Sequence, residues 1–181
     1  MYIKRFIIAL FLIFSTALPI FADEYINAKN NAYRHNNKGL LYLEDKYYYG
    51  AIKEFEIAIA LNPNSQSSAT YYSNLGRTYE LIGYHELAKP YYEQAVSLNP
   101  LYFDYYLQMV KNYKKLGIVN QKIKEFKKKK YTPLNDVVIG LLYIQKGEKR
   151  TGITILDDFM NKEEKLILSK GVKKYLQEIT K

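Results

Sequence analysis

Two stretches of this 181-residue chain are nearly the same: AIKEFEIAIALNP at residues 51–63 and AKPYYEQAVSLNP at residues 88–100. They begin 37 residues apart and are identical at six of thirteen positions. Self-similarity with a period of about 20–50 residues is typical of stacked repeats, in which only a neighbouring unit can bury the apolar face of each unit. The spacing therefore predicts an array of repeats over most of the chain.

Each stretch is interpreted as the second helix of a unit, with the first helix in the residues before it. Counted from Ala69 as repeat position 1, one helical stripe carries positions 4, 7, 8 and 11, and another carries positions 20, 24 and 27. Small residues at positions 8 and 20 allow the two helices to approach closely, and Pro100 ends the second helix, because the residue before a proline avoids the α region. The stripe positions hold Tyr72, Leu75, Gly76, Tyr79, Ala88, Tyr92 and Ala95.

The first unit, counted from Ala32, follows the same pattern with two departures. Positions 4 and 7, which are apolar in the second unit, hold His35 and Lys38. The stretch NSQSSAT at residues 64–70 adds three residues and predicts a longer loop between the units. The matching positions hold Gly39, Tyr42, Ala51, Phe55, Ala58 and Pro63.

This pattern resembles the tetratricopeptide repeat (TPR), a helix–turn–helix unit of about 34 residues with large apolar, Leu, Gly, Tyr, Ala, Phe and Pro residues at these positions. The resemblance implies an all-α, right-handed helix–turn–helix solenoid of about four repeats. It is strong at residues 32–65 and 69–102, and it is degenerate at residues 103–132 and 133–162.

The third unit loses the small residues, because Val110, Lys122 and Lys129 stand where Gly, Ala and Ala are expected. Residues 163–181 are amphipathic and predict the capping helix that a solenoid needs at its end. Residues 23–31 are a lead-in to the array.

The first 22 residues have the layout of a secretory signal peptide. Lys4 and Arg5 precede an apolar run, and a small residue, Ala22, stands at the preferred cleavage point, with Ala17 as second choice. The alternative is an uncleaved anchor through residues 6–22, at the lower limit of a membrane span. Both interpretations predict an exported protein of a bacterial periplasm or cell envelope.

The residue types argue against an enzyme. The chain has no Cys, its only histidines, His35 and His85, lie in different units, and no glycine-rich phosphate-binding sequence is present. We therefore expect no catalytic residues, no metal, no cofactor and no small-molecule substrate. The function is expected to be a non-catalytic scaffold that binds a peptide segment of another protein.

The TPR resemblance places the ligand on the concave groove formed by the first helices, chiefly at repeat positions 2, 5, 9, 12 and 13, with position 6 sometimes joining. Asn74 and Arg77 are the preferred contacts, because the second unit is the most regular. The TPR subclass that clamps a partner's C-terminus is not matched, since only Asn74 fits its pattern. Carried over, the groove residues are Tyr33, Asn36, Asn37, Leu40 and Leu43 in the first unit, Thr70, Ser73, Asn74, Arg77 and Glu80 in the second, and Leu107, Gln108, Lys111, Lys114 and Lys115 in the third.

The positive charge of the chain is one-sided. Residues 23–100 hold seven Lys and Arg against nine Asp and Glu, whereas residues 101–181 hold eighteen against nine. The stretch KIKEFKKKK at residues 122–130 has lysines only and no arginine, which disfavours nucleic acid. Two interpretations stay open: a solvated face, or an alternative function as a binder of anionic lipid or polysaccharide at the envelope surface. The lysines are Lys122, Lys124, Lys127, Lys128, Lys129 and Lys130.

Overall fold

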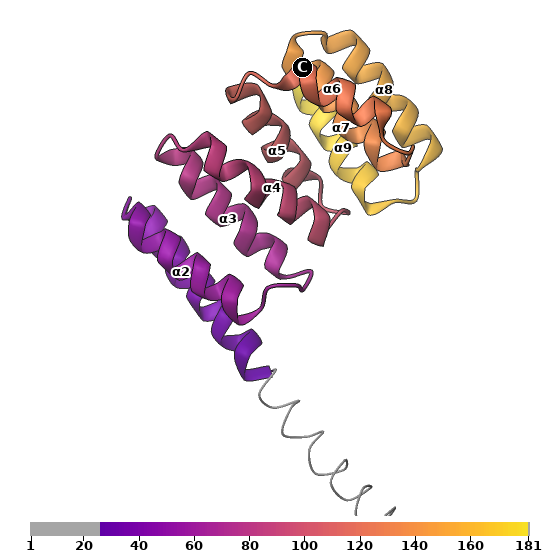
Figure 1. Cartoon of the computed structure of the whole chain (residues 1–181). Coiled ribbons are helices and arrows are strands. Elements are labelled where there is room, and N and C mark those ends of the chain that lie inside the picture. The colour runs from indigo at the N-terminus through magenta and orange to yellow at the C-terminus, as the bar shows by residue number, and fades with distance from the viewer. Residues whose placement is uncertain (1–25, 181) are drawn as a thin grey trace, which may run out of the picture.

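The computed structural model describes residues 26–180 (Figure 1). The predicted signal peptide or anchor at residues 1–22 lies outside this range. Within residues 26–180 every helix is too short or too polar to span a membrane. The secondary structure of this part of the chain is helical, without strands.

A first helix covers residues 26–44, and eight further helices follow it. Neighbouring helices pack along one array, most closely α3 with α4 and α7 with α8 (Figure 1). The predicted all-α solenoid is therefore confirmed. The bounds are α2 Tyr48–Leu61, α3 Ser68–Leu81, α4 His85–Leu98, α5 Phe103–Lys115, α6 Val119–Lys128, α7 Pro133–Lys146, α8 Lys149–Lys162 and α9 Ile167–Ile179.

Glycines at repeat position 8 hold the two helices of a unit together. A Cβ on Gly76 would stand 3.1 Å from the ring of Tyr92 and 3.3 Å from the backbone oxygen of Ala88. A Cβ on Gly140 would stand 2.7 Å from Leu156 of α8. The two helices of a unit therefore approach closely at these glycines, which is the reason the sequence pattern predicted.

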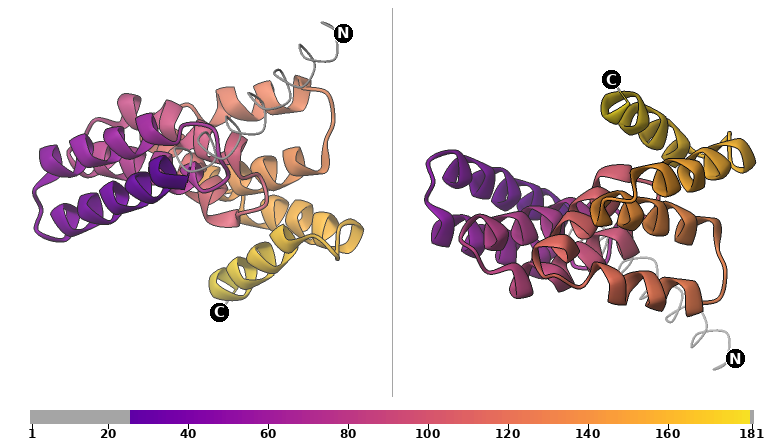
Figure 2. Two further views of the ribbon diagram at one scale, coloured as in Figure 1. Left: turned by 90° about the horizontal axis from the view of Figure 1, so that it is seen from below. Right: turned by 90° about the horizontal axis from the view of Figure 1, so that it is seen from above.

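The third unit is the exception. Its position 8 is Val110 and its position 20 is Lys122, and α5 and α6 contact each other only sparsely, whereas α3 and α4 lie together along their lengths. The larger side chains keep α6 away from α5. Figure 2, which views the array from opposite sides, places α6 and α9 on opposite sides of it.

The two departures in the first unit form one polar cluster. Glu54 of α2 is buried, and its carboxylate lies 2.6 Å from His35 Nδ1 and 2.7 Å from Lys38 Nζ. Burial alone would raise the pKa of Glu54, but the hydrogen bonds from Lys38 and His35 outweigh it and hold the pKa below its ordinary value of 4.5. The polar side chains at positions 4 and 7 thus have a partner inside the same unit.

The core contains many tyrosines, and their hydroxyl groups have partners. Tyr92 OH donates to Glu80 at 2.6 Å, Tyr113 OH to Glu93 at 2.6 Å, and Tyr106 OH to the backbone oxygen of Pro100 at 2.8 Å. Because a buried hydroxyl without a partner is costly, these bonds permit Tyr where the repeat usually has an apolar residue.

The last helix, α9, packs against α5 as well as α8. Gly171 of α9 meets the side chain of Phe103, and the rings of Phe103 and Tyr175 lie 5.5 Å apart. The buried stripe of α9 is Leu168, Val172 and Leu176. The predicted capping helix is therefore present, and it also covers the first turns of α5.

Candidate functional site

The predicted groove residues of successive first helices lie beside one another and are joined by hydrogen bonds. Asn74 Nδ2 donates to Asn36 Oδ1 at 2.8 Å, and Ser73 Oγ donates to Gln108 Oε1. Thr70 Oγ1 and Tyr105 OH lie 2.9 Å apart. These contacts bring five of the predicted residues, Asn36, Thr70, Ser73, Asn74 and Gln108, together on one face of the array, here called the groove face.

Not every predicted contact offers surface to a ligand. Asn36 and Ser73 are buried, with 4% and 5% of their surface exposed, so they hold adjacent helices together. Asn74, one of the two preferred contacts, is half-buried and already bonded to Asn36. The side chains of the groove face that are available to a ligand therefore lie elsewhere.

The exposed polar groups gather around a cavity of about 500 Å³ between α3, α5 and α7. Six of the predicted groove residues line it, and four of these six are positively charged. We call it the basic cavity. Its lining is Arg77, Glu80, Tyr92, Gln108, Lys111, Lys114, Lys115 and Gln145.

One carboxylate, Glu80, faces these cations, and it is already engaged. One of its oxygens lies 2.5 Å from Lys115 Nζ, and the other accepts a hydrogen bond from the Tyr92 hydroxyl at 2.6 Å. Burial, reinforced by the hydrogen bond to Glu80, raises the pKa of Tyr92 well above its ordinary value of 10, so the hydroxyl stays a donor at neutral pH. The lining thus keeps three positive charges in excess.

The remaining cations of the lining have no carboxylate partner. Arg77, Lys111 and Lys114 are exposed and form no ion pair with any residue between 26 and 180. Guanidinium and ammonium groups that are exposed beside a cavity can bind carboxylates of a ligand. Gln108 and Gln145 add amide groups that can bond a peptide backbone.

The predicted residues of the first helix lie outside this cavity. Tyr33 is exposed, with 61% of its surface accessible, while Asn37 and Leu40 are half-buried. They extend the groove face toward the N-terminal end of the array.

Two lining residues were missed by the sequence analysis. Gln145 stands at position 13 of the fourth unit, and counting groove positions in that unit would have found it. Tyr92 stands at a core position, where the repeat usually has Phe. The extra hydroxyl of Tyr was the only sign in the sequence that this residue has a polar partner.

The lysine stretch of α6 divides into two groups. Lys122 is largely buried and lies 3.3 Å from Glu93 and 3.1 Å from Glu125. Lys129 also pairs with Glu125, and Lys127 donates to Tyr143 OH. Lys124, Lys128 and Lys130 are exposed, and their side chains have neither an ion pair nor a hydrogen bond in the described part of the chain.

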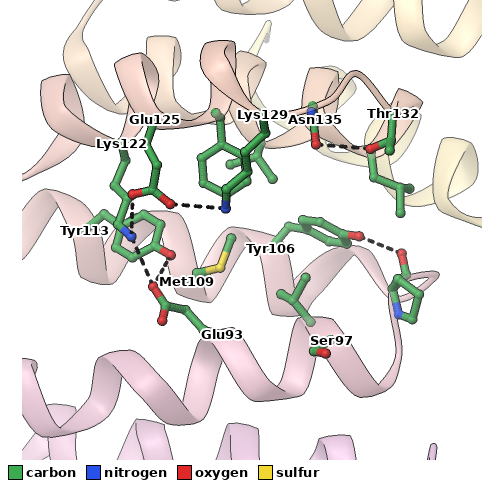
Figure 3. Close-up of a pocket in the computed structure, with 15 residues that line it drawn as sticks. Glu93, Ser97, Tyr106, Met109, Tyr113, Lys122, Glu125, Lys129, Thr132 and Asn135 are labelled. Carbon is green, nitrogen blue, oxygen red and sulfur yellow. Dashed lines mark hydrogen bonds and ion pairs between the residues drawn. The ribbon is translucent and has the colours of Figure 1, made fainter.

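A second cavity, of about 440 Å³, lies between α4 and α6 on the side of α5 away from the basic cavity (Figure 3). Glu93, Tyr113 and Lys122 gather at one end, and Tyr106 and Thr132 lie toward the other. Its two lysines and two glutamates are paired with one another, so its charge cancels. This crevice results from the displacement of α6.

No group of three or more His, Asp or Glu side chains within residues 26–180 is placed to hold a metal ion. The fold and the cavities define a helical-repeat protein with a positively charged cavity. Residues 32–65 and 69–100 match the family model described as tetratricopeptide repeat. The chain therefore contains two tetratricopeptide repeats, at residues 32–65 and 69–100.

Solved structures share this fold. The crystal structure of MamA is similar over 75% of this chain and 80% of that chain, with 25% identity and a TM-score of 0.50. A tetratricopeptide repeat protein from Parabacteroides merdae is similar over 80% of this chain and 58% of that chain, with 16% identity and a TM-score of 0.52. The second TPR domain of human RPAP3, solved in complex with the HSP70 peptide SGPTIEEVD, covers 73% of this chain and 97% of its own, with 17% identity and a TM-score of 0.50. No curated protein matches the sequence.

Proposed function

We propose that the chain is a non-catalytic interaction scaffold whose basic cavity binds an acidic segment of a partner protein. The observation that carries the proposal is the excess of positive charge around the cavity. Arg77, Lys111 and Lys114 have no carboxylate partner among residues 26–180, and Glu80 is already bonded. A TPR domain of the same fold, that of RPAP3, is known with a bound peptide, which agrees with this class of ligand.

The expected affinity from these charges is modest. An exposed ion pair contributes about 0.2–1 kcal/mol, so three pairs contribute at most about 3 kcal/mol, or roughly a hundredfold in affinity. Binding is therefore expected to weaken as salt rises, because exposed charges are screened over about 10 Å at 0.1 M ionic strength. We further propose that this partner lies in the cell envelope, because residues 1–22 have the layout of a signal peptide or anchor.

The test uses a fluorescein-labelled ten-residue peptide with three glutamates, and a second peptide with glutamines instead. Anisotropy titration should give tighter binding of the glutamate peptide. The cavity variant Arg77→Ala/Lys111→Ala/Lys114→Ala should lower its affinity by about threefold to a hundredfold. These side chains are exposed, so circular dichroism should show unchanged helix content.

A matched control removes the same charge elsewhere. The surface variant Lys124→Ala/Lys128→Ala/Lys130→Ala takes away three exposed lysines of the α6 region that lie outside the basic cavity. It should leave peptide affinity nearly unchanged. An equal loss in both variants would mean diffuse attraction to the basic half of the chain, and the cavity would not be the site.

The surface variant also tests the alternative function as a binder of anionic lipid or polysaccharide. That alternative has less support, because three of the six lysines that it requires are held by Glu93, Glu125 and Tyr143. Binding to anionic vesicles that only the surface variant abolishes would favour it over the peptide scaffold.

A further inference from the structure

An apolar cleft of about 300 Å³ lies between the start of α5 and α9. It concentrates large apolar side chains that are exposed: Ile167 has 66% of its surface accessible, Tyr102 48% and Leu101 37%. Phe103 and Leu107 of α5 complete its wall. Apolar side chains gathered in one exposed hollow are a common mark of an interaction site.

The cleft and the basic cavity occupy the same side of α5. Leu107 lines the cleft and the next residue, Gln108, lines the basic cavity, while Lys111, Lys114 and Lys115 continue the line toward the end of the helix. Residues three and four apart share a helix face, so these groups form one stripe. Tyr106 and Tyr113, which line the neutral crevice, lie on the other side.

The two hollows are separated by a short distance along the helix. From Leu107 to Lys114 the rise is about 10 Å at 1.5 Å per residue. An extended peptide covers that length in about three residues. A single segment laid along α5 can therefore fill both hollows.

The charges of the cleft indicate what it accepts. Its lining holds Asp104 and Glu178 against Lys170 and Lys174, so the charges balance. A balanced, mainly apolar lining favours an uncharged apolar side chain over another carboxylate. It differs in this respect from the basic cavity, which has positive charge in excess.

We propose that the groove face recognises a bipartite segment, in which an apolar side chain about three residues from a group of acidic residues fills the cleft between α5 and α9. This rests on the proposed function, since the acidic group occupies the basic cavity. The C-terminal helix is then part of the binding site as well as a cap, because it supplies Ile167 and one wall of the cleft. Gly171 permits this role by letting α9 reach Phe103.

The experiment extends the labelled glutamate peptide with one leucine. The leucine is placed two, three, four or six residues from the glutamates, in separate peptides and on either side. On one side, the spacing of three or four residues should bind about tenfold more tightly than the peptide without leucine, as expected from burying part of a leucine side chain. Peptides with the other spacings should show a smaller gain in affinity.

The cleft variant Leu101→Ser/Ile167→Ser should remove this gain and leave the affinity of the leucine-free peptide unchanged. Leu41→Ser/Leu87→Ser is the matched control, because these leucines are also exposed, at 60% and 52%, and lie outside the cleft. A gain that is absent at every spacing, or that survives in the cleft variant, overturns the bipartite site alone. Failure of the leucine-free glutamate peptide to depend on the basic cavity overturns the proposed function.

Discussion

Removing the carboxylate of Glu54 should destabilise the first repeat. Glutamine at this position is nearly isosteric but uncharged, so Glu54→Gln weakens two charge-assisted hydrogen bonds, from His35 and Lys38. Such bonds contribute about 1.5–3 kcal/mol each when buried. His35 and Lys38 are partly exposed and can turn to water, which reduces the expected loss of unfolding free energy to about 1–2 kcal/mol.

The assay is thermal and urea unfolding followed by circular dichroism. For a chain of this size about 1 kcal/mol corresponds to a change in Tm of about 2–4 °C, so Glu54→Gln should lower the Tm by about 3–6 °C. The pKa of Glu54 is held below 4.5 in the folded state, so its contribution is fully present above pH 4.5 and is lost as the pH falls through the lower folded value. The difference between wild type and variant should shrink in that acid range.

The second repeat provides the control. At the positions of His35 and Glu54 it carries Tyr72 and Tyr91, whose rings stack with centroids 6.4 Å apart. The variant His35→Tyr/Lys38→Leu/Glu54→Tyr gives the first repeat the residues that the second repeat has at these positions. It should match or exceed wild-type stability, because apolar packing commonly replaces an ion pair without loss. If Glu54→Gln left the Tm unchanged at pH 7, the polar cluster would have no stabilising role and the reasoning would be wrong.

Three further variants test the cavity walls and the third unit. Glu80→Gln frees Lys115 and raises the positive charge of the basic cavity, so it should tighten glutamate-peptide binding about threefold in anisotropy while lowering the Tm by about 2–4 °C. Gly171→Ala adds a methyl group against Phe103 and should cost about 1–2 kcal/mol in urea unfolding, whereas an alanine at the exposed Lys173 should not. Lys122→Ala leaves two carboxylates without their shared cation and should cost about 1 kcal/mol, with the loss greater at pH 7 than at pH 4.

The fold could be predicted from the sequence because packing repeats at fixed intervals. Gly76 and Ala88 are small because the two helices of their unit approach closely, and Gly140 is small for the same reason. Periodicity could not predict that a polar residue at one repeat position is paired with a residue far away in the sequence. His35 and Lys38 look like errors in the pattern until the fold brings Glu54 of the next helix to them.

The candidate site was predicted only in part, for the same physical reason. Arg77 and Lys111 follow from repeat position 9, because the second and the third unit both place this position on the basic cavity. The cleft beside Phe103 requires α9 to cross onto α5, and that crossing depends on the arrangement of the whole array. The face of α9 was also less clear in sequence, since Ile167 looks like a core residue but is exposed.

The lysines of α5 have no packing role that would explain them. Lys111, Lys114 and Lys115 are all exposed and share one helix face, and like charges three or four residues apart destabilise a helix by about 0.2–0.5 kcal/mol per pair. The ion pair with Glu80 offsets this repulsion for Lys115, but Lys111 and Lys114 have no such partner among the described residues. Alanine at both positions should therefore stabilise the free protein by about 0.5 kcal/mol or more while weakening peptide binding. Stability and affinity that change in opposite directions are expected of binding residues, whereas a merely solvated face would leave the affinity unchanged.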